Sequence, residues 1–276
     1  SPQVLNTFRY ADTTYSTKPS SREITIRHLL THTSGLGYGV IDGDERMKMI
    51  YHKAGVVDLF TTEKVTIEES VKRLAKLPLH HEPGTKYTYS EGLDVLGYLV
   101  EVISGKPFDV FLKERIFDPI GMNDTRFYLN DVQAPRLVTV HTRKDGKWAS
   151  YPVTFYDPAY PKTGAKTFFS GGAGLSSTTE DYAKFLQMYL NGGIYNGKRI
   201  LSSHTIHTMM QNQVGDLWNA DRYHGIGFGV VTDKGVAMGG MGSKGTFDWG
   251  GYFNTQYFAD PETGIIGLIF KQTSGA

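Results

Sequence analysis

The stretch P-G-T-K-Y-T-Y-S-E-G-L-D-V-L-G-Y-L-V-E, residues 83–101, carries the chain from a polar loop into an amphipathic helix. Ser90 and Glu91 are residue types that favour a helix start. Ser104-Gly105 is expected to end the helix, because glycine accepts the left-handed conformation of a C-terminal cap. Apolar side chains recur between these ends at the spacing of one helix face: Leu93, Leu96, Gly97, Val100 and Ile103. The sequence therefore predicts a helix that begins directly after Tyr89.

Charge and composition exclude several classes of protein. Lysine plus arginine (29) balance aspartate plus glutamate (28) without a basic run, which argues against an extended nucleic-acid surface. The absence of cysteine excludes disulfides, thiolate metal sites and cysteine nucleophiles. Apolar stretches such as Gly264–Phe270 are far shorter than the roughly 20 residues that span a bilayer. We expect a globular chain without a membrane span or cofactor, and the sequence leaves its oligomeric state open.

Capping residues and apolar spacing predict further helices. Thr66 and Glu69 form a capping box, and Ser177 with Glu180 forms another before a helix over 181–190. Shorter helices are expected over 25–33, 108–112 and 203–211, and loops over 1–21 and 128–170.

The hydrophobic period changes from helical to strand-like after residue 215. Short apolar runs alternate with turn sequences, Asp-Lys-Gly among them, at 225–231, 247–253, 255–259 and 264–270. The last three runs are expected to be neighbouring antiparallel strands. The chain is therefore predicted to be an α+β protein with a single domain over 1–276. Within it we expect a mainly helical lobe over 22–215 and strands of an antiparallel sheet over 216–276.

Histidine and serine are the first residue types to consider for chemistry. His28 and His32, and likewise His204 and His207, have spacings that could bind a metal. Without cysteine or an H-E-x-x-H pattern, surface or hydrogen-bonded imidazoles are the better interpretation, and no metal is predicted. No G-x-S-x-G occurs and no serine has lysine three residues on, so residues 1–276 contain no recognisable serine nucleophile. Lys162-Thr163-Gly164 is interpreted as a chance tripeptide in a turn.

Four blocks of the sequence point to a family. They are I-T-I-R-H-L-L-T-H-T-S-G-L (24–36), the opening stretch (83–101), R-I-F-D-P-I-G-M-N-D-T (115–125) and S-G-G-A-G-L-S-S-T-T-E-D-Y-A-K-F (170–185). Together, and in this order, they resemble the serine β-lactamase-like and penicillin-binding-protein superfamily. The match is closest to its class C-like branch of esterases, β-lactamases and D-alanyl-D-alanine peptidases. The resemblance implies a β-lactamase/transpeptidase-like fold, with a helical lobe packed on an antiparallel sheet and the active site between them.

The resemblance also implies an S-x-x-K motif several tens of residues before the first block and a helix after Phe270. The chain contains neither, so we expect it to be truncated at both ends. A cleaved two-chain protein or a natural fragment are the alternatives.

The second family motif, Tyr-x-Asn, falls on Tyr89-Ser90-Glu91. By resemblance, the phenol of Tyr89 would share protons with the nucleophile and its lysine. Glu91 stands where the family has a substrate-binding asparagine. A carboxylate accepts hydrogen bonds but donates none, so lactam or peptide recognition is disfavoured. A core aromatic at a helix start is the alternative for Tyr89.

The third family motif, Lys-Thr-Gly or His-Thr-Gly, falls on Trp249-Gly250-Gly251. The two glycines would let the strand approach a substrate closely. By resemblance, the backbone N–H of Tyr252 would donate to the oxyanion. Trp249 cannot pair with a substrate carboxylate as lysine can, which favours neutral esters over β-lactams and D-alanyl peptides. The alternative for Trp249 is an aromatic ring packed over the sheet.

The leading hypothesis is a serine hydrolase that acts through an acyl-enzyme on small esters, with its serine and lysine outside residues 1–276. A catalytically inactive binding or regulatory module, using the cleft or the aromatic loop 148–169, is the second hypothesis. A β-lactamase or D-alanyl-D-alanine carboxypeptidase, and a zinc-dependent hydrolase, are further alternatives. The expected partner is a small ester, lactam or peptide. The resemblance favours a periplasmic or secreted protein and leaves a cytoplasmic one open.

Overall fold

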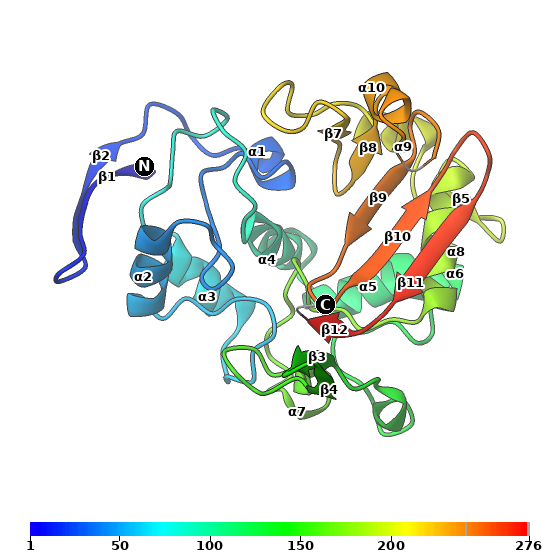
Figure 1. The fold of residues 1–276 in the computed structure, drawn as a ribbon, viewed down its shortest axis with the longest axis horizontal. Coiled ribbons are helices and arrows are strands. Elements are labelled where there is room, and N and C mark those ends of the chain that lie inside the picture. Colours follow the sequence, from blue (N-terminus) through cyan, green and yellow to red (C-terminus); the bar gives the residue numbers. More distant parts are fainter. Residues whose placement is uncertain (241, 275–276) are drawn as a thin grey trace. The chain divides into compact units, whose positions relative to one another are not determined.

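The computed structural model describes residues 1–240 and 242–274, which divide into two compact units (Figure 1). The first unit comprises residues 1–108 and 164–174, and the second comprises 109–163 and 175–276. The chain therefore leaves the first unit, folds 55 residues into the second, and returns. The predicted lobes over 22–215 and 216–276 stay a prediction.

The first unit is mainly helical. Its elements are β1 (Gln3–Arg9), β2 (Thr14–Pro19), α1 (Ile26–Leu30), α2 (Glu45–Lys53), α3 (Ile67–Leu74) and α4 (Gly92–Ser104). One core cluster joins α2 to α1 and β1 through buried Met47, Ile50, Leu29 and Val4. A second cluster places Phe168 against Ile67 of α3. The returning segment 164–174 is thus part of this unit's core.

The helix signals predicted for the first unit are confirmed. Thr66 and Glu69 form a reciprocal capping box at the start of α3. Gly105 caps α4 in the left-handed conformation, at φ 66°. Helix α1 lies inside the predicted range 25–33, where Thr25 caps it in a box with His28.

Two elements of this unit were not predicted. The expected loop over 1–21 is wrong, because β1 and β2 pair as an antiparallel hairpin. Most of its side chains are solvated, so no apolar alternation marks the strands, and the Thr7 and Ser16 hydroxyls pair across them at 2.6 Å. Helix α2 was also missed, although Asp44 caps it by accepting from the Arg46 N–H.

The second unit is built on a five-stranded antiparallel sheet in the order β11-β10-β9-β8-β7. The strands are β7 (Arg222–His224), β8 (Gly229–Val231), β9 (Phe247–Gly250), β10 (Thr255–Ala259) and β11 (Ile266–Phe270). The predicted neighbours 247–253, 255–259 and 264–270 are confirmed as the consecutive strands β9, β10 and β11. Of the predicted run 225–231, only β8 is a strand.

Smaller elements complete this unit. A second sheet, in the order β12-β3-β4, joins β3 (His141–Lys144), β4 (Lys147–Ser150) and β12 (Thr273–Ser274), and β5 (Ile194–Tyr195) pairs with β6 (Lys198–Arg199). The helices are α5 (Phe108–Leu112), which starts at the unit boundary, a π-helical turn (Lys113–Phe117), α6 (Asp118–Ile120), a 3₁₀ turn (Ala134–Arg136), α7 (Tyr160–Thr163), α8 (Thr179–Leu190), α9 (Ser203–Met209) and α10 (Asp233–Ala237).

One face of the five-stranded sheet is covered by α8 (Figure 1). Leu186 of α8 is fully buried against a cluster that includes Val230, Phe247 and Ala259 of three strands. Alternate strand residues share a face, so Asp248 and Phe258 point to the opposite side of the sheet. This opposite side carries the pocket described below.

Several local predictions for the second unit need correction. Thr178, rather than Ser177, caps α8 by accepting from the Asp181 N–H, because Ser177 Oγ pairs with Thr125 Oγ1 instead. The expected loop over 128–170 contains the β3–β4 hairpin, and its Lys162-Thr163 belongs to α7. The expected Asp-Lys-Gly turn is the first turn of α10, capped by Thr232.

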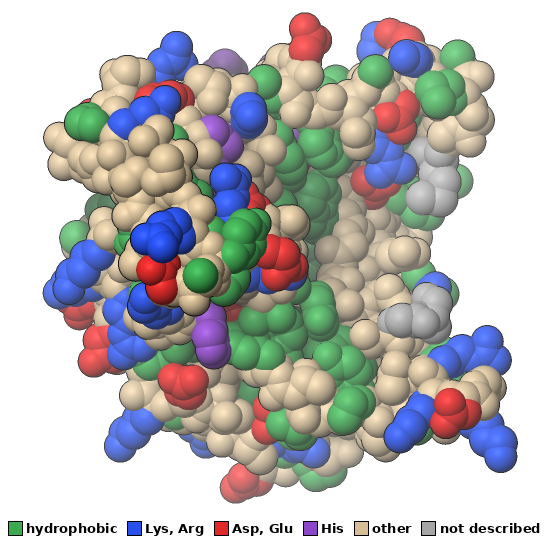
Figure 2. Space-filling model, turned by 60° about the vertical axis from the view of Figure 1, so that its left-hand side comes forward, with side chains coloured by type: hydrophobic (Ala, Val, Ile, Leu, Met, Phe, Trp, Pro, Cys, Tyr) green, Lys and Arg blue, Asp and Glu red, His purple; other side chains and the backbone are tan. Residues whose placement is uncertain are grey.

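Surface charge is mixed. On the face drawn in Figure 2, basic and acidic side chains are interspersed, in keeping with the balanced composition. Among the described residues, no helix combines the length and hydropathy needed to cross a bilayer.

Leu186 gives a direct test of the packing of α8. Its side chain is 0% exposed, so Leu186→Ala is expected to cost about 3 kcal/mol of unfolding free energy through lost burial and a cavity. Urea unfolding would measure it. Glu180→Gln, at an 83% exposed side chain of the same helix, is expected to change stability by less than about 0.5 kcal/mol. Equal effects of the two substitutions would contradict this packing.

Candidate functional site

Tyr89, Ser90 and Glu91 lie in the loop that leads into α4. Tyr89 is half-buried, whereas Ser90 is 0% and Glu91 2% exposed. Glu91 occupies the cap position without a side-chain capping bond, while Ser90 Oγ accepts from the Gly92 N–H at 3.3 Å. The triplet thus begins the helix, as predicted, and leaves the tyrosine the most exposed of the three.

His32 fixes the loop that carries Tyr89. Its Nδ1 accepts from the Ser90 N–H at 3.2 Å, and its carbonyl accepts from the Thr88 N–H at 2.8 Å. Its ring contacts Tyr87 edge-on, with centroids 5.7 Å apart, and Tyr89 in a tilted geometry at 4.6 Å. Because His32 is 3% exposed, it holds the Tyr89 backbone and ring from one side. The sequence had suggested it only as a possible metal ligand.

Buried carboxyl groups surround the start of α4. Burial raises the pKa of Glu91 well above its usual range, and the charges of Asp58 and Asp94 raise it further. Its Oε1 accepts no hydrogen bond from the described residues. Glu91 is therefore a neutral acid at neutral pH. The sequence argument took it to be an ionised acceptor, but a neutral carboxyl can also donate a hydrogen bond.

Asp94 ties α4 to the returning segment 164–174. Its Oδ1 accepts from Ser170 Oγ at 2.7 Å and from the Gly172 N–H at 3.1 Å. Burial raises the pKa of Asp94 to about 6, although both hydrogen bonds act to lower it. A Cβ on Gly171 would lie 2.2 Å from the Leu93 carbonyl oxygen, so only glycine permits this approach. Nothing in the sequence pattern distinguished Asp94 or Asp58 from solvated acids.

The other predicted residues form the end of β9 and the turn after it. Trp249 and Gly250 close the strand, and Gly251 N–H donates to the Thr255 carbonyl at 2.7 Å. The Asn254 N–H donates to the Gly251 carbonyl at 3.0 Å, which makes residues 251–254 a tight turn. Tyr252 is one of its two central residues and is 40% exposed. A Cβ on Gly251 would overlap Thr255 Oγ1, so the turn also requires glycine.

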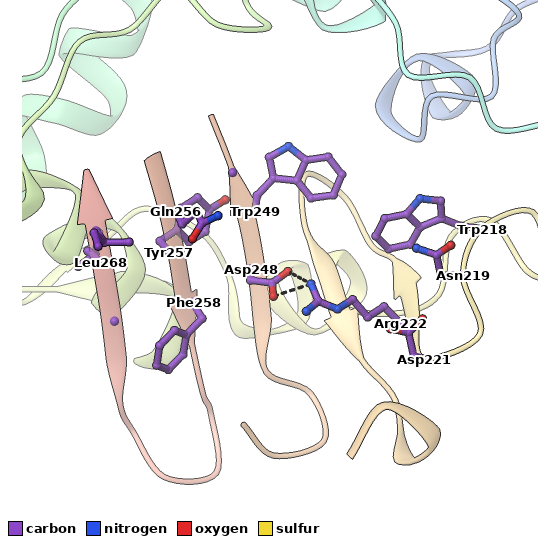
Figure 3. Close-up of a pocket in the computed structure, with 13 residues that line it drawn as sticks. Trp218, Asn219, Asp221, Arg222, Asp248, Trp249, Gln256, Tyr257, Phe258 and Leu268 are labelled. Carbon is purple, nitrogen blue, oxygen red and sulfur yellow. Dashed lines mark hydrogen bonds and ion pairs between the residues drawn. The ribbon is translucent and has the colours of Figure 1, made fainter. Parts of the chain in front are cut away.

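Trp249 stands beside a pocket on the uncovered face of the sheet (Figure 3). Its ring lies 5.9 Å from that of Trp218 and 5.5 Å from that of buried His224, whose pKa burial lowers to about 4. The cavity has a volume of about 730 Å³. Arg222 and Asp248 lie in its floor, joined by two contacts of 2.6 Å, so the arginine charge is neutralised.

The predicted site residues thus fall into two groups. Tyr89 and Glu91 lie together in the first unit, and Trp249, Gly250, Gly251 and Tyr252 share one hairpin of the second. His28 Nδ1 accepts from the Thr25 N–H, so it serves as a helix cap. Within 1–240 and 242–274, no group of three or more histidines and acids is arranged to hold a metal ion.

Known proteins resemble this chain over nearly its whole length. The family model described as Beta-lactamase matches residues 9–276. Protein Rv1367c of Mycobacterium tuberculosis is 33% identical over 272 residues, which cover 93% of this chain and 64% of that protein. Esterase EstB of Burkholderia gladioli is 29% identical over 272 residues, covering 91% and 65%. The chain therefore spans less than two thirds of the length of these curated relatives.

A solved structure supports the same relationship. The structure of EstCE1, described as a hydrolase with promiscuous acyltransferase activity, matches with a TM-score of 0.80 at 27% identity. The match covers 99% of this chain and 70% of that one.

The raised pKa of Asp94 predicts a pH dependence of stability. A carboxyl with a folded pKa of about 6 and an ordinary unfolded value of 3.8 stabilises the fold below pH 4, and this contribution is lost as pH rises through 6. Asp94→Asn is therefore expected to gain about 3 kcal/mol relative to the wild type between pH 4 and pH 7. Urea unfolding at both pH values would measure it, with exposed Asp216→Asn as the control. A constant difference would contradict the assignment.

Proposed function

This chain belongs to the beta-lactamase family and has its β-lactamase/transpeptidase-like fold of helices and antiparallel sheets, and we propose that it is part of an esterase-like serine hydrolase. The reaction proceeds through an acyl-enzyme. The nucleophilic serine and its lysine lie outside residues 1–276, on the longer protein that the relatives' lengths suggest.

The pocket beside Trp249 is the observation that carries the substrate class. Its lining is largely aromatic and aliphatic, and Arg222, the cation among the lining residues, is already paired with Asp248. A substrate carboxylate would have to compete with Asp248 for that charge. Neutral esters meet no such competition, so they are favoured over lactams and D-alanyl peptides. The esterase EstB among the relatives supports the same class.

In the proposed mechanism, Tyr89 carries protons. The serine oxygen attacks the ester carbonyl, and its proton passes through the Tyr89 phenol and the lysine to the leaving alcohol. Water then attacks the acyl-enzyme, gives up its proton by the same route, and releases the acid and the serine hydroxyl. His32 holds Tyr89 in position through the Ser90 N–H and through ring contact.

The Tyr252 backbone stabilises the oxyanion. Its N–H, together with that of the nucleophile, donates to the carbonyl oxygen as negative charge develops there. The tight turn over 251–254 fixes this amide, and Gly250 and Gly251 leave room for the substrate. Neutral Glu91 would serve as a hydrogen-bond donor near Tyr89, where the family motif has an amide.

A catalytically inactive binding module is the second candidate. It is favoured by one observation, the lack within residues 1–276 of any serine followed three residues on by lysine. Export to a periplasm or secretion remains part of the proposal by family resemblance alone.

Substrate ranking tests the proposed class. The full-length gene product is expected to hydrolyse a short-chain nitrophenyl ester with a higher kcat/KM than a chromogenic cephalosporin or a D-alanyl-D-alanine peptide. Steady-state kinetics on the three substrates would measure the order. A preference for either carboxylate-bearing substrate would contradict the esterase assignment, and no turnover of any would favour the inactive module.

Removing the Tyr89 hydroxyl tests the mechanism. Tyr89→Phe is expected to lower kcat roughly 100- to 10,000-fold, because it removes the proton carrier and keeps the ring. Tyr87→Phe is the matched control, since Tyr87 contacts the same His32 ring but has no proposed chemical role. Circular dichroism would check that both variants fold. Similar losses in the two variants would count against Tyr89 as the proton carrier.

A further inference from the structure

We propose that the segment 151–156 forms, with Tyr252 and Phe253, a fixed aromatic wall that binds an apolar acyl group of the ester substrate. This inference rests on the proposed function, because it takes Tyr252 as the oxyanion donor. We call the five rings concerned the aromatic wall: Tyr151, Phe155, Tyr156, Tyr252 and Phe253.

The five rings of the aromatic wall form an unbroken chain of edge-to-face contacts. Tyr252 lies at its middle, with its ring centroid 5.1 Å from Tyr156 and 5.1 Å from Phe253. Phe155 extends the chain beyond Tyr156 at 5.3 Å, and Tyr151 extends it beyond Phe253 at 5.4 Å. Interplanar angles of 74° to 82° are those of favourable T-shaped pairs. The wall is therefore continuous with the proposed oxyanion donor.

Backbone hydrogen bonds hold both parts of the wall. The Tyr151 N–H donates to the Val140 carbonyl at 2.8 Å, directly after the β3–β4 hairpin. The Phe253 carbonyl accepts from the Thr273 N–H at 2.9 Å, at the start of β12. Because β12 pairs with β3, the loop and the turn are attached to the same small sheet. A surface fixed in this way loses little conformational entropy on binding.

Exposure and charge define what the wall accepts. Tyr156 is 1% exposed and anchors the cluster, while Phe155 is 51% and Tyr252 40% exposed. Val153, 69% exposed, adds an aliphatic side chain from the same segment. The stretches Y-P-V-T-F-Y (151–156) and Y-F-N-T-Q (252–256) contain no charged residue. An uncharged apolar group therefore fits this surface, and a charged one would lose hydration without a partner.

The acyl group, rather than the alcohol, is the proposed occupant. Both groups are attached to the carbonyl carbon whose oxygen the Tyr252 N–H binds. The alcohol departs after the first step, whereas the acyl group stays bonded to the enzyme through both. A fixed wall on the oxyanion donor itself can contact the acyl group in both transition states, which raises kcat/KM for larger acyl groups.

Acyl-length kinetics test the wall. With the full-length product, the ratio of kcat/KM for nitrophenyl octanoate to that for nitrophenyl acetate is expected to fall about tenfold in Phe155→Ala. Trp148→Ala is the matched control, because Trp148 is an exposed aromatic (55%) of the preceding strand that stacks under Arg143 and lies outside the ring chain. It is expected to leave the ratio unchanged. An unchanged ratio in Phe155→Ala, or an equal fall in both variants, would overturn the proposal.

Two further measurements separate this inference from the proposed function. If Phe155→Ala alters the preference among octanoate, hexanoate and butyrate esters of different alcohols only through the alcohol, the acyl assignment is overturned. Calorimetric binding of octanamide, which needs no hydrolysis, is expected to weaken about tenfold in Phe155→Ala. That result would support the wall even if the wild type hydrolysed no ester and the proposed function failed. Equal octanamide binding by both proteins would overturn the wall.

Discussion

The first unit depends on the buried carboxyl of Asp94. It joins the start of α4 to Ser170 and Gly172, which follow Asp94 in the sequence only after the chain has folded 55 residues into the second unit. Gly171 allows the approach because its missing Cβ leaves room for the Leu93 carbonyl. This one contact fixes where the returning segment ends and where α4 begins, and hence where the loop with Tyr89 must lie.

Electrostatics at this position oppose stability. Asp94 and Glu91 are both buried with raised pKa values, and Asp58 is buried near them. Burying carboxyl groups costs free energy that a well-packed apolar group would not cost. Such clusters are more often functional than stabilising. The hydrogen bonds from Ser170 and Gly172 offset part of that cost for Asp94, while Glu91 is kept neutral beside the proposed proton carrier.

Local signals predicted some elements and tertiary contacts decided the others. The Thr66 box, the Gly105 cap and the apolar runs of β9, β10 and β11 are written in neighbouring residues, so α3, α4 and the sheet order at that edge could be predicted. The β1–β2 hairpin could not, because its polar side chains face solvent and carry no alternation. At the site, motif resemblance found Tyr89 and Trp249. It missed His32, Asp58 and Asp94, because their burial arises from segments tens of residues apart. Trp218 was missed for the same reason, since only the fold brings it beside Trp249.

The central claim is that Tyr89 and the hairpin over 249–252 serve a serine nucleophile on the same protein. Intact-mass and peptide analysis of the full-length gene product after reaction with a fluorophosphonate tests it most directly. The account predicts one covalent adduct per chain, on a serine followed three residues on by lysine and located outside residues 1–276. An adduct on any serine within residues 1–276, or no adduct on a folded protein, would contradict it.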